Sequence, residues 1–185
     1  MDSPVYQLKI VLNGVKPPVW RRVLVTGNTT ISLLHEIIQV AMGWDNCHLH
    51  RFVIHDKEYG VSYEGGVRFA DNPDKVRLSE FRFRPAERFE YQYDFGDNWE
   101  HTVTVEKLLP GDAAQTYPIC IGGREECPPE DSGGPWIYSA RRQGKSRKLV
   151  NADAKSAERT FDAKQVNMLL QNLHTRWFTR TNAIG

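Results

Sequence analysis

The chain has 185 residues, of which 40% are hydrophobic and 25% are charged, a composition typical of a folded globular protein and not of a disordered one. No stretch approaches the roughly 18 consecutive apolar residues of a membrane helix, and the first residues, MDSPVYQLKI, lack the basic and apolar regions of a signal peptide. We therefore expect a cytoplasmic protein that makes no membrane contact. Three cysteines are too few for a disulfide framework.

The first part of the chain predicts the order strand, strand, helix, strand. Apolar and polar residues alternate over 5–12 and again over 19–25, and the turn-forming NGVKPP lies between them, which indicates a hairpin of half-buried strands. The segment HLHRFVIH at 48–55 alternates in the same way, with His50, Phe52 and Ile54 on one face.

The helix in this opening is expected within TTISLLHEIIQVAMGW, residues 29–44, where the apolar residues recur with a helical period. Thr30 or Ser32 is the expected N-cap and Gly43 the expected C-terminal stop. His35 falls outside the main apolar stripe, so we expect it on the surface of the helix.

A second hairpin is predicted from FEYQYDF and WEHTVTV, which both alternate cleanly. A three-residue loop over 96–98 would place Phe95 opposite Trp99 and Tyr93 opposite His101. The preceding residues 59–81 are irregular apart from a short element near 76–81, and residues 117–136, with two Gly-Gly pairs, predict a compact loop.

The C-terminal part predicts one amphipathic helix over 161–178. Asp162 is the expected cap, and the expected buried stripe consists of Val166, Leu169, Leu170, Leu173 and Trp177. The fold class is therefore α+β: one domain over 1–140 with a mixed or antiparallel sheet, a basic linker over 141–160, and the helix packed back on the domain.

The charges are distributed unevenly along the chain. Residues 1–140 hold 14 Lys and Arg against 20 Asp and Glu, a net charge of −6, whereas residues 141–185 hold 10 against 3, a net charge of +7. The basic excess is concentrated at Arg141, Arg142, Lys145, Arg147 and Lys148. Such a cluster either binds a phosphate backbone or forms a solvated loop that complements the acidic body.

The stretch YDFGDNWEH carries more ionisable groups than a core hairpin needs. We expect its turn to pack against the 118–136 loop and to form one functional rim, with candidate residues Asp94, Asp97, His101, Glu130 and Asp131. Grouped carboxylates suit a cation or acid–base chemistry, but they also occur as ordinary turn and capping residues.

The sequence does not decide which group bonds to the His101 ring. A buried imidazole needs a hydrogen bond. The candidates are Tyr93 or a backbone carbonyl, an acidic residue of the loop (Glu130 or Asp131), or a zinc ion held with Cys120 and Cys127. Six residues separate these cysteines, a looser spacing than that of most zinc sites. Two buried free thiols or a local disulfide are the alternatives, and no cofactor is expected.

Four motifs in order carry a family resemblance: PPVWRRV, LLHEIIQVAMGW with HLHRF, YDFGDNWEH, and CIGGREECPPEDSGGPW. Together they resemble the plasmid pRiA4b ORF-3-like family from about Tyr6 to Trp136. The resemblance implies a single prokaryotic α+β domain, in some members linked to plasmids and other mobile elements, and it implies no established activity. Ser132 stands where family members often have a cysteine, which weakens any metal site that uses that thiolate.

The sequence identifies no catalytic residue, since it contains neither a nucleophile elbow nor a phosphate-binding loop. We interpret the protein as a binding module for a protein or nucleic acid partner. One alternative is a nucleic-acid-binding accessory protein that uses the 141–148 cluster. The other is a metal-dependent enzyme that uses Asp94, Asp97 and His101 with the 120–131 loop. Oligomeric state is not determined by these patterns.

Overall fold

The structure is a computed structural model that describes residues 3–63, 66–142 and 161–182, with side chains up to residue 177. Within these ranges the chain forms seven strands and three α-helices. The strands are β1 Val5–Leu12, β2 Trp20–Thr26, β3 His50–Ile54, β4 Lys57–Gly60, β5 Arg88–Tyr93, β6 Trp99–Leu109 and β7 Ile119–Arg124; the helices are α1 Ile31–Met42, α2 Gly134–Arg142 and α3 Ala163–Asn182, with a short 3-10 helix η1 at Leu78–Phe81.

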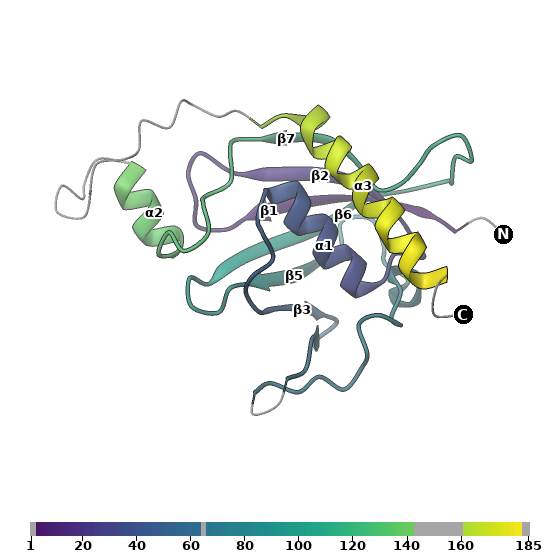
Figure 1. Cartoon of the computed structure of the whole chain (residues 1–185), viewed down its shortest axis with the longest axis horizontal. Coiled ribbons are helices and arrows are strands. Elements are labelled where there is room, and N and C mark those ends of the chain that lie inside the picture. The colour runs from purple at the N-terminus through teal and green to yellow at the C-terminus, as the bar shows by residue number, and fades with distance from the viewer. Residues whose placement is uncertain (1–2, 64–65, 143–160, 183–185) are drawn as a thin grey trace.

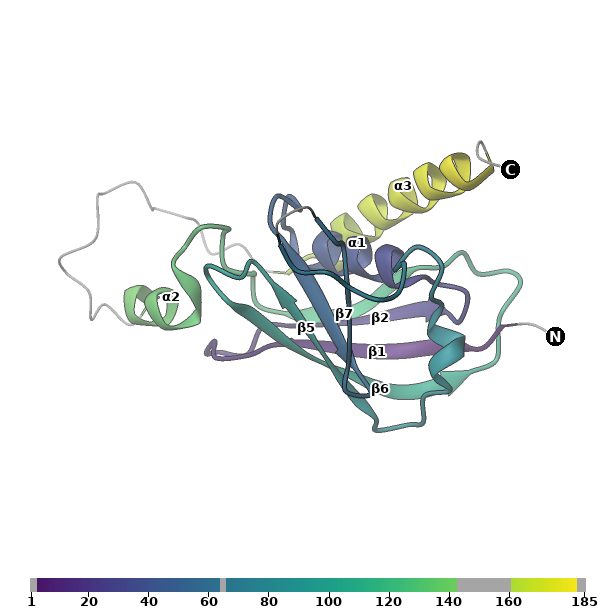
Figure 2. The same cartoon turned by 90° about the horizontal axis from the view of Figure 1, so that it is seen from below.

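One sheet contains all seven strands in the order β4-β3-β5-β6-β1-β2-β7, and every neighbouring pair is antiparallel. Helices α1 and α3 both lie over the same face of this sheet, while α2 lies beyond one end of it (Figures 1 and 2). The predicted α+β class, the β-β-α-β opening, the later hairpin and the C-terminal helix are confirmed. None of the helices in the described ranges combines the length and apolar character that a bilayer-spanning segment requires.

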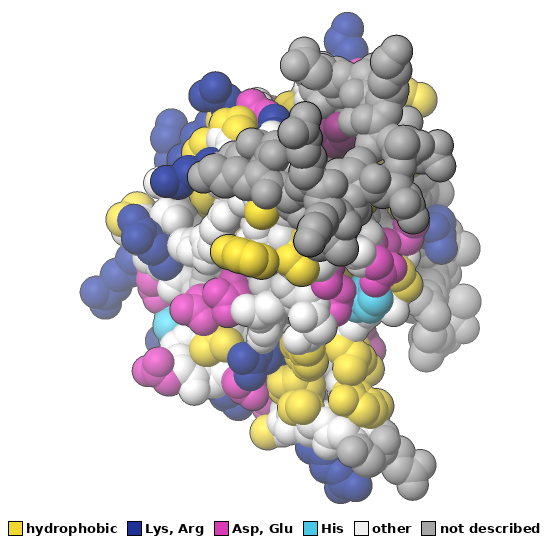
Figure 3. Space-filling model, turned by 90° about the vertical axis from the view of Figure 1, so that its left-hand side faces the viewer, with side chains coloured by type: hydrophobic (Ala, Val, Ile, Leu, Met, Phe, Trp, Pro, Cys, Tyr) yellow, Lys and Arg dark blue, Asp and Glu magenta, His cyan; other side chains and the backbone are white. Residues whose placement is uncertain are grey.

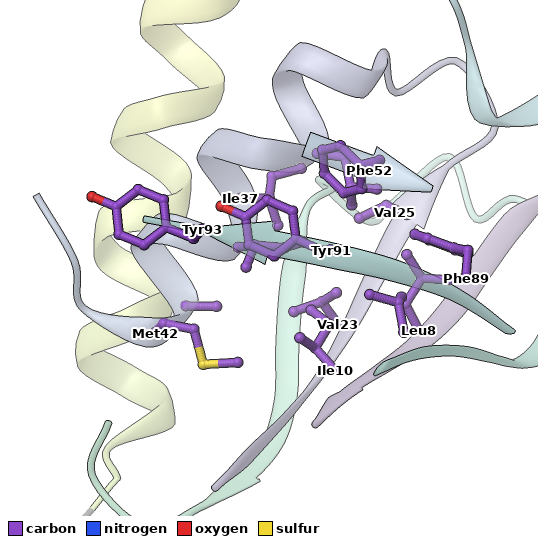
Figure 4. Close-up of a cluster of buried hydrophobic side chains, with 14 of the residues drawn as sticks. Leu8, Ile10, Val23, Val25, Ile37, Met42, Phe52, Phe89, Tyr91 and Tyr93 are labelled. Atoms are coloured by element: carbon purple, nitrogen blue, oxygen red, sulfur yellow. The ribbon is translucent and has the colours of Figure 1, made fainter. Parts of the chain in front are cut away.

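The core lies between the sheet and α1. Alternate residues of the central strands point to this side, and Leu8, Ile10, Phe52 and Tyr91 have no measurable exposure. Figure 4 shows the rings of Tyr91 and Tyr93 beside α1, with aliphatic side chains from β1 and β2 behind them. Burial of each large apolar side chain stabilises the fold by roughly 1.5–3 kcal/mol, so the alternating pattern fixes which face the helix covers.

At both ends of α1, backbone groups without a partner inside the helix find specific hydrogen-bond partners. The Thr30 hydroxyl accepts a hydrogen bond from Leu33 N at 3.2 Å, and Gly43 adopts a left-handed conformation with φ 84°, as the sequence predicts. The Arg21 guanidinium donates to the Ala41 carbonyl at 2.7 Å, one of the carbonyls that a helix end leaves without an internal partner. Arg21 is buried, and burial lowers its pKa from the ordinary value. It therefore joins β2 to the helix from within the core.

Helix α3 lies against α1 and β7. The Asp162 carboxylate caps it by accepting from Lys164 N at 2.8 Å, and the helix begins two residues later and ends four residues later than predicted. Leu170 and Leu173 are buried, but Leu169 is 47% exposed, so its expected place in the buried stripe is wrong. The stripe is narrower than expected because α3 packs on one helix and an edge strand and is open to solvent elsewhere.

The register of the second hairpin differs from the predicted one by two residues. Tyr93 pairs with Trp99 and Tyr91 with His101. The turn closes earlier because the Asp94 carboxylate accepts from Gly96 N at 2.9 Å, and Asp94 itself has φ 54°. A shift of two residues keeps every side chain on its expected face, but it removes Phe95 from the pairing and leaves it 38% exposed.

Three other elements were absent from the sequence prediction. Strand β4 extends the sheet beside β3, β7 lies within the predicted 117–136 loop, and α2 begins at the end of that loop and continues to Arg142. The glycines in β7 have a packing role: a Cβ on Gly123 would lie 2.8 Å from the Phe161 ring. Helix α2 ends at Arg142, two residues into the predicted linker, and residues 143–160 lie outside the described residues.

Adjacent leucines of α3 test whether this helix is an integral part of the fold. Leu170→Ala should lower the free energy of unfolding by about 2–5 kcal/mol because it leaves a cavity against α1 and β7. Leu169→Ala, the matched control, should change it by less than about 0.5 kcal/mol. Chemical denaturation measures both. Equal effects of the two substitutions would show that α3 does not pack as described.

Candidate functional site

The Tyr93 hydroxyl joins three segments at the end of β5. It accepts hydrogen bonds from Cys47 N at 3.0 Å and His48 N at 3.3 Å, and it donates a short hydrogen bond to the Glu130 carboxylate. The other Glu130 oxygen accepts from Asp45 N at 3.1 Å and from the Cys47 thiol at 3.4 Å. Burial, and then the bond to Glu130, raise the pKa of Tyr93. Glu130 therefore acts mainly as a structural link between the 45–48 segment and the loop before α2.

The hairpin turn and the loop before α2 are in direct contact. The Asp97 carboxylate accepts from Gly133 N at 2.9 Å. A Cβ on Gly134 would lie 2.3 Å from the Asp97 carbonyl oxygen, and Gly134 has φ 78°, so only glycine fits this close approach. The Gly-Gly pair of the sequence motif thus brings the loop onto the turn, and Asp97 serves as an anchor of that contact.

His48 lies between two carboxylates that this contact brings together. Its Nε2 atom is 3.2 Å from Asp131 Oδ1 and 3.8 Å from Asp94 Oδ2. Asp94 is 7% exposed and uses its other oxygen to accept from Gly96 N and Asp97 N, whereas the Asp131 side chain is 77% exposed. Within the described residues, His48 Nε2 is buried and has no hydrogen-bond partner of good geometry. This imidazole was not among the candidate rim residues.

The face that carries these groups is mixed in character. Figure 3 looks onto the side of the molecule where α2 and the hairpin turn lie, and it shows a histidine among acidic side chains and a group of hydrophobic side chains below them. A rim of this kind favours positively charged or neutral groups over anions.

His101 lies apart from this rim. It is 1% exposed, its Nδ1 lies 3.2 Å from the Tyr91 carbonyl oxygen, and the Trp44 ring packs edge-on against it with 5.4 Å between ring centroids. Burial lowers the pKa of His101 to about 4. The partner of this imidazole is therefore a backbone carbonyl, and neither Tyr93 nor a carboxylate of the loop takes that place.

Cys120 and Cys127 are both buried free thiols. Burial raises the pKa of each thiol, so both side chains stay protonated. Among the described residues, the clusters of side chains with metal-ligand spacing contain neither cysteine, nor His101. The expected zinc set of these three residues is thus not assembled.

The structure also contains a pair of stacked histidines that the sequence did not predict. His35 and His50 stack with 3.4 Å between ring centroids and an interplanar angle of 6°. His35 is buried, contrary to its expected surface position, because both ring nitrogens have partners: Nδ1 lies 2.8 Å from the Tyr91 hydroxyl and Nε2 lies 2.6 Å from Asn46 Oδ1. Burial lowers the pKa of His35 to about 4 and that of His50 to about 3, so both rings are neutral at pH 7.

The histidine pair lines a cleft of about 610 Å³ between α1, β3 and the C-terminal part of α3. Its lining includes His35, Asn46, His48, Leu49, His50 and Trp177. A second hollow of about 600 Å³, beside His55 and Arg84, is more open to solvent. The first cleft has the size of a small-molecule site and combines apolar walls with a few polar groups, as such sites do.

Only the first two residues of the basic cluster lie within the described ranges. Arg141 donates to the Ser132 carbonyl at 3.1 Å, and Arg142 donates to the Glu125 carboxylate at 2.9 Å. Lys145, Arg147 and Lys148 lie outside the described residues. Both described arginines therefore make contacts within the protein.

Comparison with known proteins identifies the family. The model of the plasmid pRiA4b ORF-3-like protein family matches residues 4–168. The chain belongs to the pRiA4b ORF-3-like family. The uncharacterised protein y4hQ of Sinorhizobium fredii (strain NBRC 101917 / NGR234) is 40% identical over 142 residues, which cover 75% of this chain and 71% of that protein.

A solved structure shares the fold of this pRiA4b ORF-3-like protein. The crystal structure of MM3350, a protein of unknown function from Methanosarcina mazei Go1, matches with a TM-score of 0.74 and 32% identity and covers 89% of this chain and 98% of that chain. Neither relative's name describes an activity, so the function must be argued from the geometry of this chain.

The link between Tyr93 and Glu130 can be tested in this pRiA4b ORF-3-like protein by a double-mutant cycle. Tyr93→Phe and Glu130→Gln should each lower the free energy of unfolding by about 1–3 kcal/mol, because each removes or weakens a part-buried hydrogen bond to a carboxylate. Their combined effect should be clearly smaller than the sum of the two. Glu90→Gln, at an exposed position of β5, is the control. Additive effects would contradict the bond.

The buried His101 predicts a dependence of stability on pH. Its folded pKa of about 4 lies below the ordinary value of 6.5, so as the pH falls from 6.5 to 4 the unfolded chain binds a proton that the folded chain does not, and stability is lost. His101→Leu should therefore reduce the loss between pH 7 and pH 5 by about 2 kcal/mol. Urea unfolding at both pH values measures this.

Val103→Ala is the matched control for the pH experiment, since Val103 is the next inward-facing residue of β6. It should lower stability equally at both pH values. If His101→Leu leaves the difference between pH 7 and pH 5 unchanged, His101 does not remain neutral in the folded protein.

Proposed function

We propose that this protein is a binding module that takes a neutral or positively charged small organic molecule in the cleft beside His35 and His50. The observation that carries the proposal is the cleft itself, whose volume of about 610 Å³ falls within the range of small-molecule sites. His50, whose buried Nε2 atom has no hydrogen-bond partner among the described residues, and the Asn46 amide supply hydrogen-bonding groups next to the apolar Leu49 and Trp177.

The charges around the cleft support a neutral or cationic ligand. Glu36 and Asp74 line it, and none of the described lining residues is a lysine or an arginine. Burial keeps His35 and His50 uncharged at pH 7, so these two rings add no positive charge to the lining. An anion such as a nucleic acid backbone would therefore be repelled here. The cleft thus differs in ligand preference from the basic 141–148 cluster, whose charge would attract an anion.

Nucleic acid binding through the basic cluster stays a second, weaker proposal. The acidic body and the internal contacts of Arg141 and Arg142 do not favour a broad phosphate-binding surface. A metal-dependent enzyme that uses His101 finds no support in the position of that residue, since His101 is 1% exposed. We therefore favour binding in the cleft, because His35, His50 and Asn46 line one cavity there.

A matched ligand pair tests the proposal. We expect tryptamine, as a member of a panel of aromatic and aliphatic amines, to raise the melting temperature of the protein, and indole-3-acetate, which has the same ring and the opposite charge, to have no effect. Isothermal titration calorimetry would give the stoichiometry. A complete absence of binding across the panel at millimolar concentration, or equal binding of amine and acid, would contradict the proposal.

Two leucines with the same exposure supply the variant and its control. Leu49 lines the cleft and Leu108 lies on β6 outside it, and each is 40% exposed. Leu49→Arg should abolish amine binding by filling the cleft and adding a positive charge, while Leu108→Arg should leave it unchanged. Equal behaviour of the two variants would place the ligand elsewhere.

A further inference from the structure

The side chains of His48, Asp94 and Asp131 have the arrangement of a metal-ligand set. Their ligand atoms all lie within 4.8 Å of one another. Around an ion bound at 2.0–2.2 Å, neighbouring ligand atoms are about 2.8–3.6 Å apart. The distance of 3.2 Å from His48 Nε2 to Asp131 Oδ1 fits this range, and that of 3.8 Å to Asp94 Oδ2 is slightly longer.

Two observations independent of this spacing point to a missing ligand. The Nε2 atom of His48 is buried and has no hydrogen-bond partner of good geometry among the described residues. Asp94 is a buried residue, with 11% of its side chain exposed; its Oδ1 accepts from two backbone N–H groups, and its Oδ2 faces His48. A buried carboxylate and a buried imidazole nitrogen that face one another without a good hydrogen bond leave a polar gap that a cation fills well.

The fold holds the three ligands in place from three separate segments. His48 is fixed because its backbone N–H donates to the Tyr93 hydroxyl, and Asp94 is fixed by the hairpin turn. Asp131 is carried by the loop that Asp97 anchors through Gly133 N. Ligands that the surrounding structure positions in advance lose less conformational freedom when an ion binds.

We propose that His48, Asp94 and Asp131 bind a divalent transition-metal ion of the Mn²⁺ to Zn²⁺ series. One imidazole and two carboxylates form a donor set that suits these ions, whereas Mg²⁺ and Ca²⁺ prefer oxygen ligands alone. The site adjoins the cleft, because His48 lines that cleft as well, but metal binding does not depend on the proposed small-molecule ligand.

Cys47 and Glu130 offer a rival set with the same histidine. In that set the Glu130 carboxylate already accepts from the Tyr93 hydroxyl, Asp45 N and the Cys47 thiol. An ion there would have to break the link that joins the loop to the 45–48 segment. The set with Asp94 and Asp131 requires no such loss, and the two sets make different predictions for substitutions.

Titration of untagged, EDTA-treated full-length protein with ZnCl₂ and MnCl₂ at pH 7 tests the proposal, with MgCl₂ as a comparison. We expect one ion per chain and a rise in melting temperature. Asp94→Asn and Asp131→Asn should each weaken binding at least tenfold. Cys47→Ser and Glu90→Gln should bind as the unchanged protein does. Asparagine retains the oxygen that accepts the turn N–H bonds, so Asp94→Asn should stay folded, which circular dichroism checks.

Three outcomes would overturn the proposal. They are no binding of Zn²⁺ or Mn²⁺ up to millimolar concentration, binding that survives both aspartate substitutions, and binding that is lost in Cys47→Ser. The first would mean that His48 forms only an ion pair with the aspartates, and the third would assign the ion to the rival set. Because the titration contains no amine, its result is separate from that of the tryptamine experiment.

Discussion

The Tyr93 hydroxyl is the constraint on which the arrangement of the site depends. It lies at the end of a central strand, and it bonds to the segment after α1 through two N–H groups and to the loop before α2 through Glu130. These three segments are far apart in the chain, and each carries one ligand of the proposed metal site or a residue next to it. The Tyr93 hydroxyl, together with the bond from Gly133 N to Asp97, therefore brings His48 and Asp131 close to each other. Its elevated pKa keeps the hydroxyl proton available to Glu130.

Charge separates the interior of the site from its edge. The stacked His35 and His50, like His101, are kept neutral by burial, because moving a charged imidazole out of water costs free energy that nothing nearby offsets. The carboxylates of Asp131, Glu36 and Asp74 remain at the edge of the cleft or its rim. Neutral polar groups within the cleft and carboxylates at its edge suit a cation or a neutral molecule. This distribution of charge supports both the proposed small-molecule site and the proposed metal site.

Residues of the motifs that carry the resemblance to the pRiA4b ORF-3-like family have identifiable structural roles in this fold. The PPEDSGG part of the last motif supplies Glu130, Asp131 and the two glycines that approach the hairpin turn. Ser132 donates to the Pro129 carbonyl at 2.8 Å and is not part of the proposed ligand set. The segments that carry His48, Asp94 and Asp131 thus meet at one rim, although they are dispersed in sequence.

The sequence by itself determined the fold class, the end of α1 at Gly43 and the faces of the strands, because periodicity and capping act over a few residues. It left two candidates for the N-cap of α1, and it predicted the contact between the hairpin turn and the following loop without its geometry. Only the tertiary structure decided that β7 completes the sheet, that Leu169 stays exposed, and that His101 bonds to a backbone carbonyl. It also decided the roles of His35 and His48. A histidine in a helix or before a strand has no local signature of burial; its surroundings come from segments such as β5 and the loop at 128–134, whose positions depend on packing across the whole sheet.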